Sequence, residues 1–175
     1  LHTETIPRAE LGGRTVPRTL LDMHARVCEH LDVEPLEFLE RMRDVDRELR
    51  ETRYAQDLEV PTDLRFGLLV ERLGLALPEL TRALVEMHMG GLRAQVRAVA
   101  HHAGLLASLR RQARVGLCSN FSHSPTALRV LAESGLDAHL DAVVISDALG
   151  IRKPRPEIFC AVLEALDVAP EETLH

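Results

Sequence analysis

Three residues carry groups that could bind a phosphoryl group: Ser119, Asn120 and Lys153. Ser119 and Asn120 end a short apolar run, so a hydroxyl and backbone N–H groups leave the end of a buried strand together and can hold two phosphate oxygens. Lys153 stands before Pro154 in a loop, where its cation can neutralise both a phosphoryl group and a nearby carboxylate. Each feature alone is ordinary, because strand-end serines are usually turn or cap residues and lysines beside prolines are usually solvated.

The elements that position these residues differ between the two halves of the chain. Residues 17–99 predict successive amphipathic helices, because apolar side chains recur at helical spacing and β-branched residues are few. Residues 114–119 and 142–145 suit buried strands, and helices are expected over 124–135 and 156–166. Strand and helix alternating across short joints indicate an α/β fold with a parallel sheet covered by helices. In such a sheet, ligands bind at the carboxyl ends of the strands.

Prolines, serines and glycines mark the expected ends of these elements. Ser124, followed by a proline, predicts a helix N-cap, and a helix is expected to start within residues 61–63. Residues 78–99 predict one helix, or two helices interrupted at Gly90–Gly91. Residues 1–16, with Gly12–Gly13, are the most linker-like part of the chain, and residues 174–175 are expected to begin a third strand.

Taken in order, these motifs resemble those of the haloacid dehalogenase-like (HAD) hydrolase superfamily. Leu117-Cys118-Ser119-Asn120 resembles its second motif, a hydrophobic strand that ends in serine or threonine and often asparagine. The run Gly150-Ile151-Arg152-Lys153-Pro154-Arg155-Pro156-Glu157-Ile158-Phe159 resembles its third motif, a lysine followed by Pro-x-Pro and an apolar-aromatic pair. The resemblance implies an incomplete Rossmann-like core over residues 100–175, a helical cap domain over 17–99, and a linker over 1–16 that leads from a first strand outside the chain.

The resemblance also implies the roles of single residues. Ser119 and Lys153 would be catalytic, and Ser119 together with the Asn120 backbone N–H would bind substrate. Members of the family attack substrate with an aspartate in a DxD motif, and Mg²⁺ usually supports that attack. No DxD motif on a strand precedes the helical region and the acidic fourth motif does not occur in the sequence, so no metal ligand is predicted within it. Both ends lie beside positions of catalytic motifs, and we expect the chain to be a fragment that is inactive alone.

These features predict the parent protein to be a phosphatase of small phosphorylated metabolites that forms an aspartyl-phosphate intermediate. One alternative is a 2-haloacid dehalogenase, which often has Ser-Asn at the second motif but commonly has tyrosine where this chain has Phe159. Another is a non-catalytic binding protein that retains the fold. Asp147 is expected to pair with Lys153 or Arg152, or to form a surface salt bridge.

Composition and charge indicate which partners the protein can bind and which cellular compartment suits it. The formal charge of -6 and the pI near 5.8 argue against nucleic acid or an anionic membrane as a partner. The sequence has no apolar run long enough to span a membrane and no signal-peptide pattern, so the cytoplasm is expected. Three scattered cysteines suit reduced thiols, and Cys118 is expected to be buried and inert.

Overall fold

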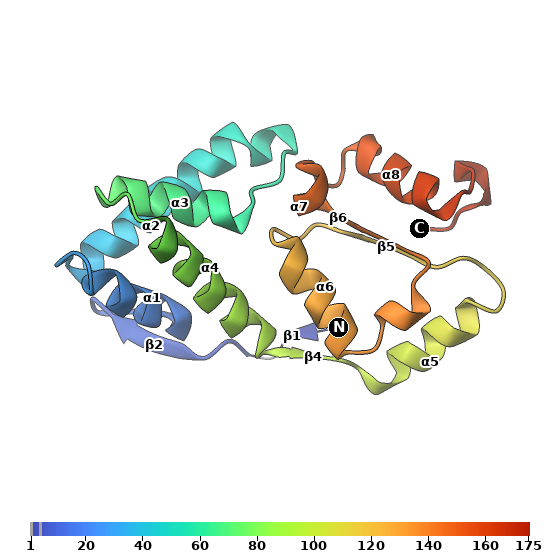
Figure 1. Ribbon diagram of the computed structural model, residues 1–175, viewed down its shortest axis with the longest axis horizontal. Coiled ribbons are helices and arrows are strands. Elements are labelled where there is room, and N and C mark those ends of the chain that lie inside the picture. The colour runs from blue at the N-terminus through green and yellow to red at the C-terminus, as the bar shows by residue number, and fades with distance from the viewer. Residues whose placement is uncertain (1, 4) are drawn as a thin grey trace. The chain divides into compact units, whose positions relative to one another are not determined.

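The computed structural model describes residues 2–3 and 5–175 as two compact units (Figure 1). The helical unit contains the described residues of Thr3–Thr52 and Pro61–Val96, and the α/β unit contains His2, Arg53–Val60 and Arg97–His175. Two short strands, β1 (His2–Thr3) and β4 (Val96–Arg97), pair with each other. The short segment Arg53–Val60 therefore belongs with the α/β unit although helical residues flank it on both sides.

The helical unit begins with an antiparallel hairpin of β2 (Arg8–Leu11) and β3 (Arg14–Pro17). Leu11 pairs with Arg14, which leaves a two-residue turn of Gly12 and Gly13 with φ of 57° and 71°. Two consecutive positive φ angles suit a tight hairpin turn, and glycine adopts them without steric cost. The region predicted to be a linker thus contains a hairpin, because the glycine pair closes a turn between strands. Leu1 and Glu4 of that region lie outside the described residues.

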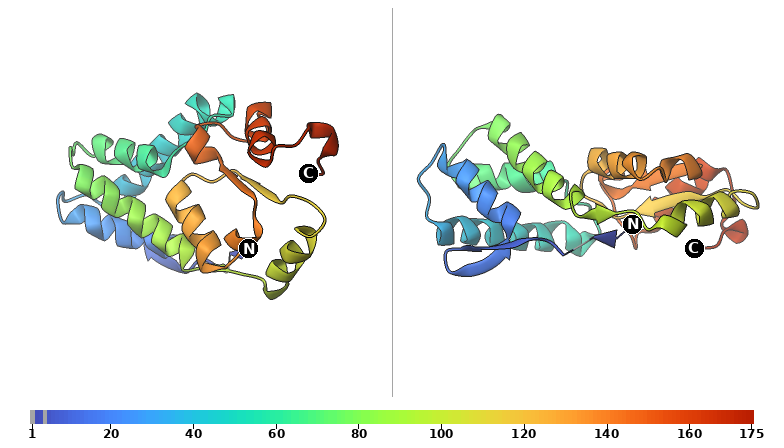
Figure 2. Two further views of the ribbon diagram at one scale, coloured as in Figure 1. Left: turned by 45° about the vertical axis from the view of Figure 1, so that its right-hand side comes forward. Right: turned by 90° about the horizontal axis from the view of Figure 1, so that it is seen from below.

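Four helices follow the hairpin: α1 (Arg18–Cys28), α2 (Pro35–Thr52), α3 (Thr62–Arg72) and α4 (Pro78–Arg93). Helices α1 and α4, α3 and α4, and α2 and α3 pack against one another, as the views in Figure 2 show. Their apolar stripes, at the spacing that one helix face requires, form a buried core. Its members include Met23, Val27, Phe38, Met42, Val45, Phe66, Leu69, Leu80 and Leu84.

Helix α4 continues through Gly90 and Gly91, where the sequence left open an interruption. A Cβ built on Gly91 would overlap the Thr19 side chain of α1, whereas one on Gly90 would meet nothing within 4 Å. Gly91 therefore allows close approach of α1 to α4. In this helix a glycine reflects packing rather than a break, since the backbone hydrogen bonds of the helix do not require a side chain.

The α/β unit is built on two parallel strands, β5 (Gly116–Ser119) and β6 (Ala142–Ile145), with Ser119 paired to Ile145. Helix α8 (Pro156–Leu166) packs on both strands, and a Cβ built on Gly116 would lie 2.9 Å from Leu166 Cδ1. The remaining elements of this unit are α5 (Ala100–Leu109), α6 (Ser124–Glu133), α7 (Ser146–Leu149) and three short 3-10 turns at Tyr54–Gln56, Asp137–His139 and Pro170–Glu172. The predicted α/β class with a parallel strand pair is confirmed.

The segment Arg53–Val60 is bound to the α/β unit through its main chain. Leu58 and Ile151 form an antiparallel bridge, Glu59 N–H donates to Gly150 O at 2.9 Å, and Arg152 N–H donates to Asp57 O at 3.0 Å. These contacts fix the segment beside the loop that carries Lys153. The sequence placed these residues in the helical region, because no local pattern distinguishes an extended connector that pairs with a distant loop.

Two other expectations concern the ends of elements and the membrane. Residues 174–175, expected to begin a third strand, are not in a strand, and in the described part of the chain they follow the turn at Pro170–Glu172. A strand needs a neighbour for its backbone groups, and neither β5 nor β6 pairs with them. Among the described residues, every helix is too short or too polar to cross a bilayer.

Candidate functional site

The predicted residues come together at the carboxyl end of β5. Ser119 is the last residue of this strand, and Asn120 follows it. The Lys153 ammonium donates to the carbonyl of Cys118, the residue before Ser119, at 2.8 Å, so the cation lies beside the end of β5. Lys153 is the single lysine of the sequence, and its side chain is only partly exposed. A hydroxyl, a strand-end backbone and a cation therefore occupy one strand end.

The Asn120 side chain holds the Lys153 loop in place. Its Nδ2 donates to Lys153 O at 3.0 Å, and its Oδ1 accepts from Lys153 N–H at 2.7 Å. This pair of hydrogen bonds satisfies both backbone groups of Lys153 and fixes the base of its side chain beside the strand. The sequence predicts that Asn120 acts through its backbone N–H, and the structure adds this role for its side-chain amide. No sequence pattern indicates that contact, because Asn120 and Lys153 are 33 residues apart.

Ser146, which the sequence analysis did not single out, fixes the next residue of the loop. It is fully buried, and its Oγ accepts from Phe121 N–H at 2.9 Å. Ser146 follows β6 directly, just as Ser119 ends β5, and the two strand ends are neighbours in the parallel pair. A serine at the end of each predicted strand was therefore the available signal.

Two side chains satisfy the first backbone groups of α6. Asp147 Oδ2 accepts from Ser124 N–H at 2.6 Å, and His123 Nδ1 accepts from Thr126 N–H at 3.3 Å. The N-cap is thus His123 rather than the predicted Ser124. The expected pairing of Asp147 with Lys153 or Arg152 is replaced by this backbone contact, because a carboxylate stabilises the positive end of a helix.

The electrostatics of the strand end favour a neutral thiol beside a cation. Burial raises the pKa of the Cys118 thiol above its ordinary value of 9.0, and the neighbouring Lys153 charge lowers it by less. The thiol is therefore protonated at neutral pH and carries no negative charge toward Lys153. Since thiolates are the reactive form of cysteine, this shift disfavours Cys118 as a nucleophile.

The described residues show no preformed cluster of metal-ligating side chains. No three His, Cys, Asp or Glu side chains in residues 2–3 and 5–175 are grouped as metal ligands. Mg²⁺ requires oxygen ligands in near-octahedral geometry, and the carboxylate next to the loop, that of Asp147, already accepts from the α6 backbone. The groups of the strand end suit an anion.

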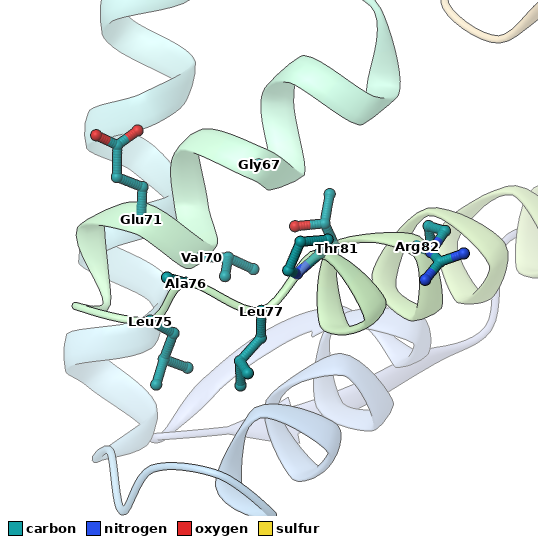
Figure 3. Close-up of a pocket in the computed structure, with 9 residues that line it drawn as sticks. Gly67, Val70, Glu71, Leu75, Ala76, Leu77, Thr81 and Arg82 are labelled. Atoms are coloured by element: carbon teal, nitrogen blue, oxygen red, sulfur yellow. The ribbon is translucent and has the colours of Figure 1, made fainter.

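A separate hollow lies in the helical unit, at the turn between α3 and α4 (Figure 3). Its volume is about 510 Å³, and Leu75 and Leu77 contribute apolar side chains, with Glu71 and Arg82 among the charged residues that line it. It contains none of the predicted site residues. Its lining is mainly apolar, whereas the end of β5 brings together a hydroxyl, backbone groups and a cation.

Comparison with known proteins identifies a family and a number of similar solved structures. A family model for haloacid dehalogenase-like hydrolases matches residues 2–175. The magnesium-bound crystal structure of YfnB from Bacillus subtilis, named as a HAD-hydrolase, shows 18% sequence identity and a TM-score of 0.46, covering 89% of this chain and 67% of YfnB. No curated protein sequence matches the chain.

Proposed function

The chain belongs to the haloacid dehalogenase-like hydrolases, and we propose that within this family it serves the hydrolysis of small phosphorylated metabolites in the cytoplasm. The observation that carries the proposal is the position of Lys153, whose ammonium lies 2.8 Å from the Cys118 carbonyl, at the strand end formed by Ser119 and Asn120. A cation, a hydroxyl and backbone N–H groups at one strand end match the three oxygens and the charge of a phosphoryl group.

Each residue then has a separate task. Ser119 Oγ and the Asn120 backbone N–H hydrogen-bond two phosphoryl oxygens and orient the phosphorus. Lys153 neutralises the charge that gathers as a carboxylate approaches the phosphoryl group, because two anions repel at close range. The Asn120 amide acts on Lys153 through its backbone, so it is a positioning residue.

The nucleophile in this proposal is an aspartate contributed from outside these 175 residues. Its carboxylate bonds to phosphorus while the bond from phosphorus to the leaving alcohol oxygen breaks, and that oxygen takes a proton from the second aspartate of the DxD motif, also outside these residues. Water then cleaves the aspartyl phosphate and releases inorganic phosphate. Family members generally use Mg²⁺, and because the described residues do not form its site, its carboxylate ligands would also come from outside them.

A substrate panel with a single-residue control tests the proposal. The polypeptide that includes the aspartate is assayed against phosphomonoesters and 2-haloacids, with and without Mg²⁺. We expect phosphate release that Lys153→Ala lowers by about a hundredfold or more, as for loss of a group that stabilises transition-state charge. Arg155→Ala is the matched control, because it removes a cation from the same loop that pairs with Glu157, and we expect little change.

Other results would each contradict the proposal in a different way. Hydrolysis restricted to 2-haloacids would assign the chain to the dehalogenase type. Absence of turnover on the whole panel, with the protein folded, would indicate a binding protein that retains the fold. Equal rates for wild type and Lys153→Ala would remove the assigned role of the lysine.

A further inference from the structure

A carboxylate is buried in the α/β unit outside the predicted site residues. Glu59, in the Arg53–Val60 segment, is 2% exposed. Its Oε1 accepts from Val60 N–H at 3.0 Å and lies 3.7 Å from Arg152 Nη1, and its Oε2 accepts from Ser146 Oγ. The Arg152 guanidinium in turn stacks over the Tyr54 ring at 4.3 Å. A charge removed from water needs such compensation, and these three donors supply it.

The Ser146 hydroxyl links the Glu59 carboxylate to the loop after β5 through hydrogen bonds. A hydroxyl has one proton, and Ser146 Oγ lies near both the Glu59 carboxylate and Phe121 O, the latter at 3.3 Å. The Glu59 carboxylate is the nearer and stronger acceptor, so the Ser146 hydroxyl donates its hydrogen bond to Glu59 rather than to Phe121 O. The lone pairs of Oγ are then free to accept from Phe121 N–H at 2.9 Å. Glu59 thereby fixes the orientation of the Ser146 hydroxyl, so that its oxygen accepts from Phe121 N–H.

We propose that Glu59 is a positioning residue for the phosphate-binding loop Ser119–Phe121 and acts through Ser146. The inference rests on the proposed function, because it concerns how that anion site is held. Ser119 is fixed on one side by its pairing in the sheet, and Phe121 is fixed two residues later by Ser146. The Asn120 backbone N–H, which lies between these points, keeps one direction only while both anchors hold.

The carboxylate of Glu59 is not needed to hold its own segment. That segment is bound by the bridge between Leu58 and Ile151 and by the backbone hydrogen bonds of residues 57 and 59 with 152 and 150. Replacing the side chain of Glu59 therefore leaves the main-chain contacts in place. The structure thus separates the two effects, and a variant at Glu59 tests the loop rather than the attachment of the segment.

The test measures binding of inorganic phosphate to the 175-residue chain by titration calorimetry, together with amide hydrogen exchange at Phe121. Ser146→Ala removes the acceptor of Phe121 N–H. Glu59→Gln replaces one carboxylate oxygen with an NH₂ group, which then faces either the Val60 N–H or the Ser146 hydroxyl, both of which are donors to Glu59 in the wild type. We expect each variant to weaken phosphate binding by about five- to tenfold, the equivalent of one hydrogen bond, and to accelerate Phe121 exchange by about the same factor.

The double variant distinguishes positioning from general destabilisation. If Glu59 acts through Ser146, the Glu59→Gln/Ser146→Ala protein binds phosphate about as well as Ser146→Ala alone. The control is Asp141→Asn, whose carboxylate accepts from Val115 N–H at 2.9 Å at the opposite end of β5. We expect this control to leave both phosphate affinity and Phe121 exchange near the wild-type values.

Three results would overturn the inference: unchanged Phe121 exchange in Ser146→Ala and Glu59→Gln, losses that add in the double variant, or equal losses in Asp141→Asn. If the folded wild type binds no phosphate, the proposed function fails instead. The exchange rates and their coupling still decide whether Glu59 positions the loop, so the two failures are distinguishable. A variant that loses its helical circular dichroism is replaced by Glu59→Asp, which keeps the charge but shortens the reach.

Discussion

His88 makes the helical unit sensitive to acid. It lies on α4, with its ring edge-on to Phe66 at a centroid distance of 5.3 Å. The pKa of His88 is lowered from 6.5 to about 4, first by burial and second by the Arg65 cation, while the Asp46 carboxylate acts in the opposite direction. Arg65 and Asp46 bind each other through two hydrogen bonds of 2.7 and 2.8 Å, so the carboxylate is largely occupied by its own partner.

The sign of the effect follows from the two protonation states. Below about pH 6.5 the unfolded chain takes up a proton on this histidine, while the folded unit does not until the pH approaches about 4. The unfolded state binds more protons in that window, so the free energy of unfolding decreases as the pH falls through it. The slope approaches about 1.36 kcal/mol for each pH unit between the two pKa values, and the decrease from pH 8 to pH 5 is about 2 kcal/mol from His88 alone.

Urea unfolding of wild type and His88→Gln at about pH 8 and pH 5 measures this contribution. The carboxylates titrate in both proteins, so the difference between their pH dependences isolates the histidine. We expect wild type to lose about 2 kcal/mol more than the variant between the two pH values. Identical losses, or an imidazole that titrates near pH 6.5 by NMR in the folded protein, would refute the reasoning.

Two further predictions concern the loop clamp and the helix contact. Asn120→Ala removes both hydrogen bonds to the Lys153 backbone, and we expect it to lower the free energy of unfolding by about 2 kcal/mol and to weaken inorganic phosphate binding. Full phosphate affinity in this variant would disprove the clamp. Gly91→Ala should destabilise the protein, because the methyl group meets Thr19, whereas Gly90→Ala should stabilise it by about 0.5–1 kcal/mol through helix propensity. Thermal unfolding of the two variants measures these effects, and melting temperatures that shift in the same direction in both variants would contradict the prediction.

Local patterns predicted the elements of the α/β unit well. The strand at 142–145 and the helix at 156–166 were confirmed with the same bounds, because an apolar run and an N1 proline are signals carried within each element. The grouping of Ser119 with Lys153 followed from the rule that parallel strands end at one edge. The structure supports that grouping with the 2.8 Å contact from Lys153 to Cys118 O.

Contacts between distant segments could not be predicted from those patterns. Glu59 had no signal in the sequence, because its burial depends on an extended connector pairing with residues about 90 positions later, and acids are common in such connectors. The Gly12–Gly13 turn was taken as a linker although the same dipeptide closes hairpins. Asp147 was expected near a cation, but the backbone N–H groups of α6 compete for the same carboxylate.

Binding of inorganic phosphate to the wild-type chain and to Lys153→Met tests the central claim most directly. Methionine keeps most of the length of the side chain and removes its charge, so the comparison isolates the cation at the end of β5. We predict a saturable site in wild type that Lys153→Met weakens by about tenfold to a hundredfold, the range for a charge-assisted hydrogen bond, with Arg155→Ala unchanged. Equal affinities in wild type and Lys153→Met, or equal losses in Lys153→Met and Arg155→Ala, would contradict a phosphoryl site built on Ser119, Asn120 and Lys153.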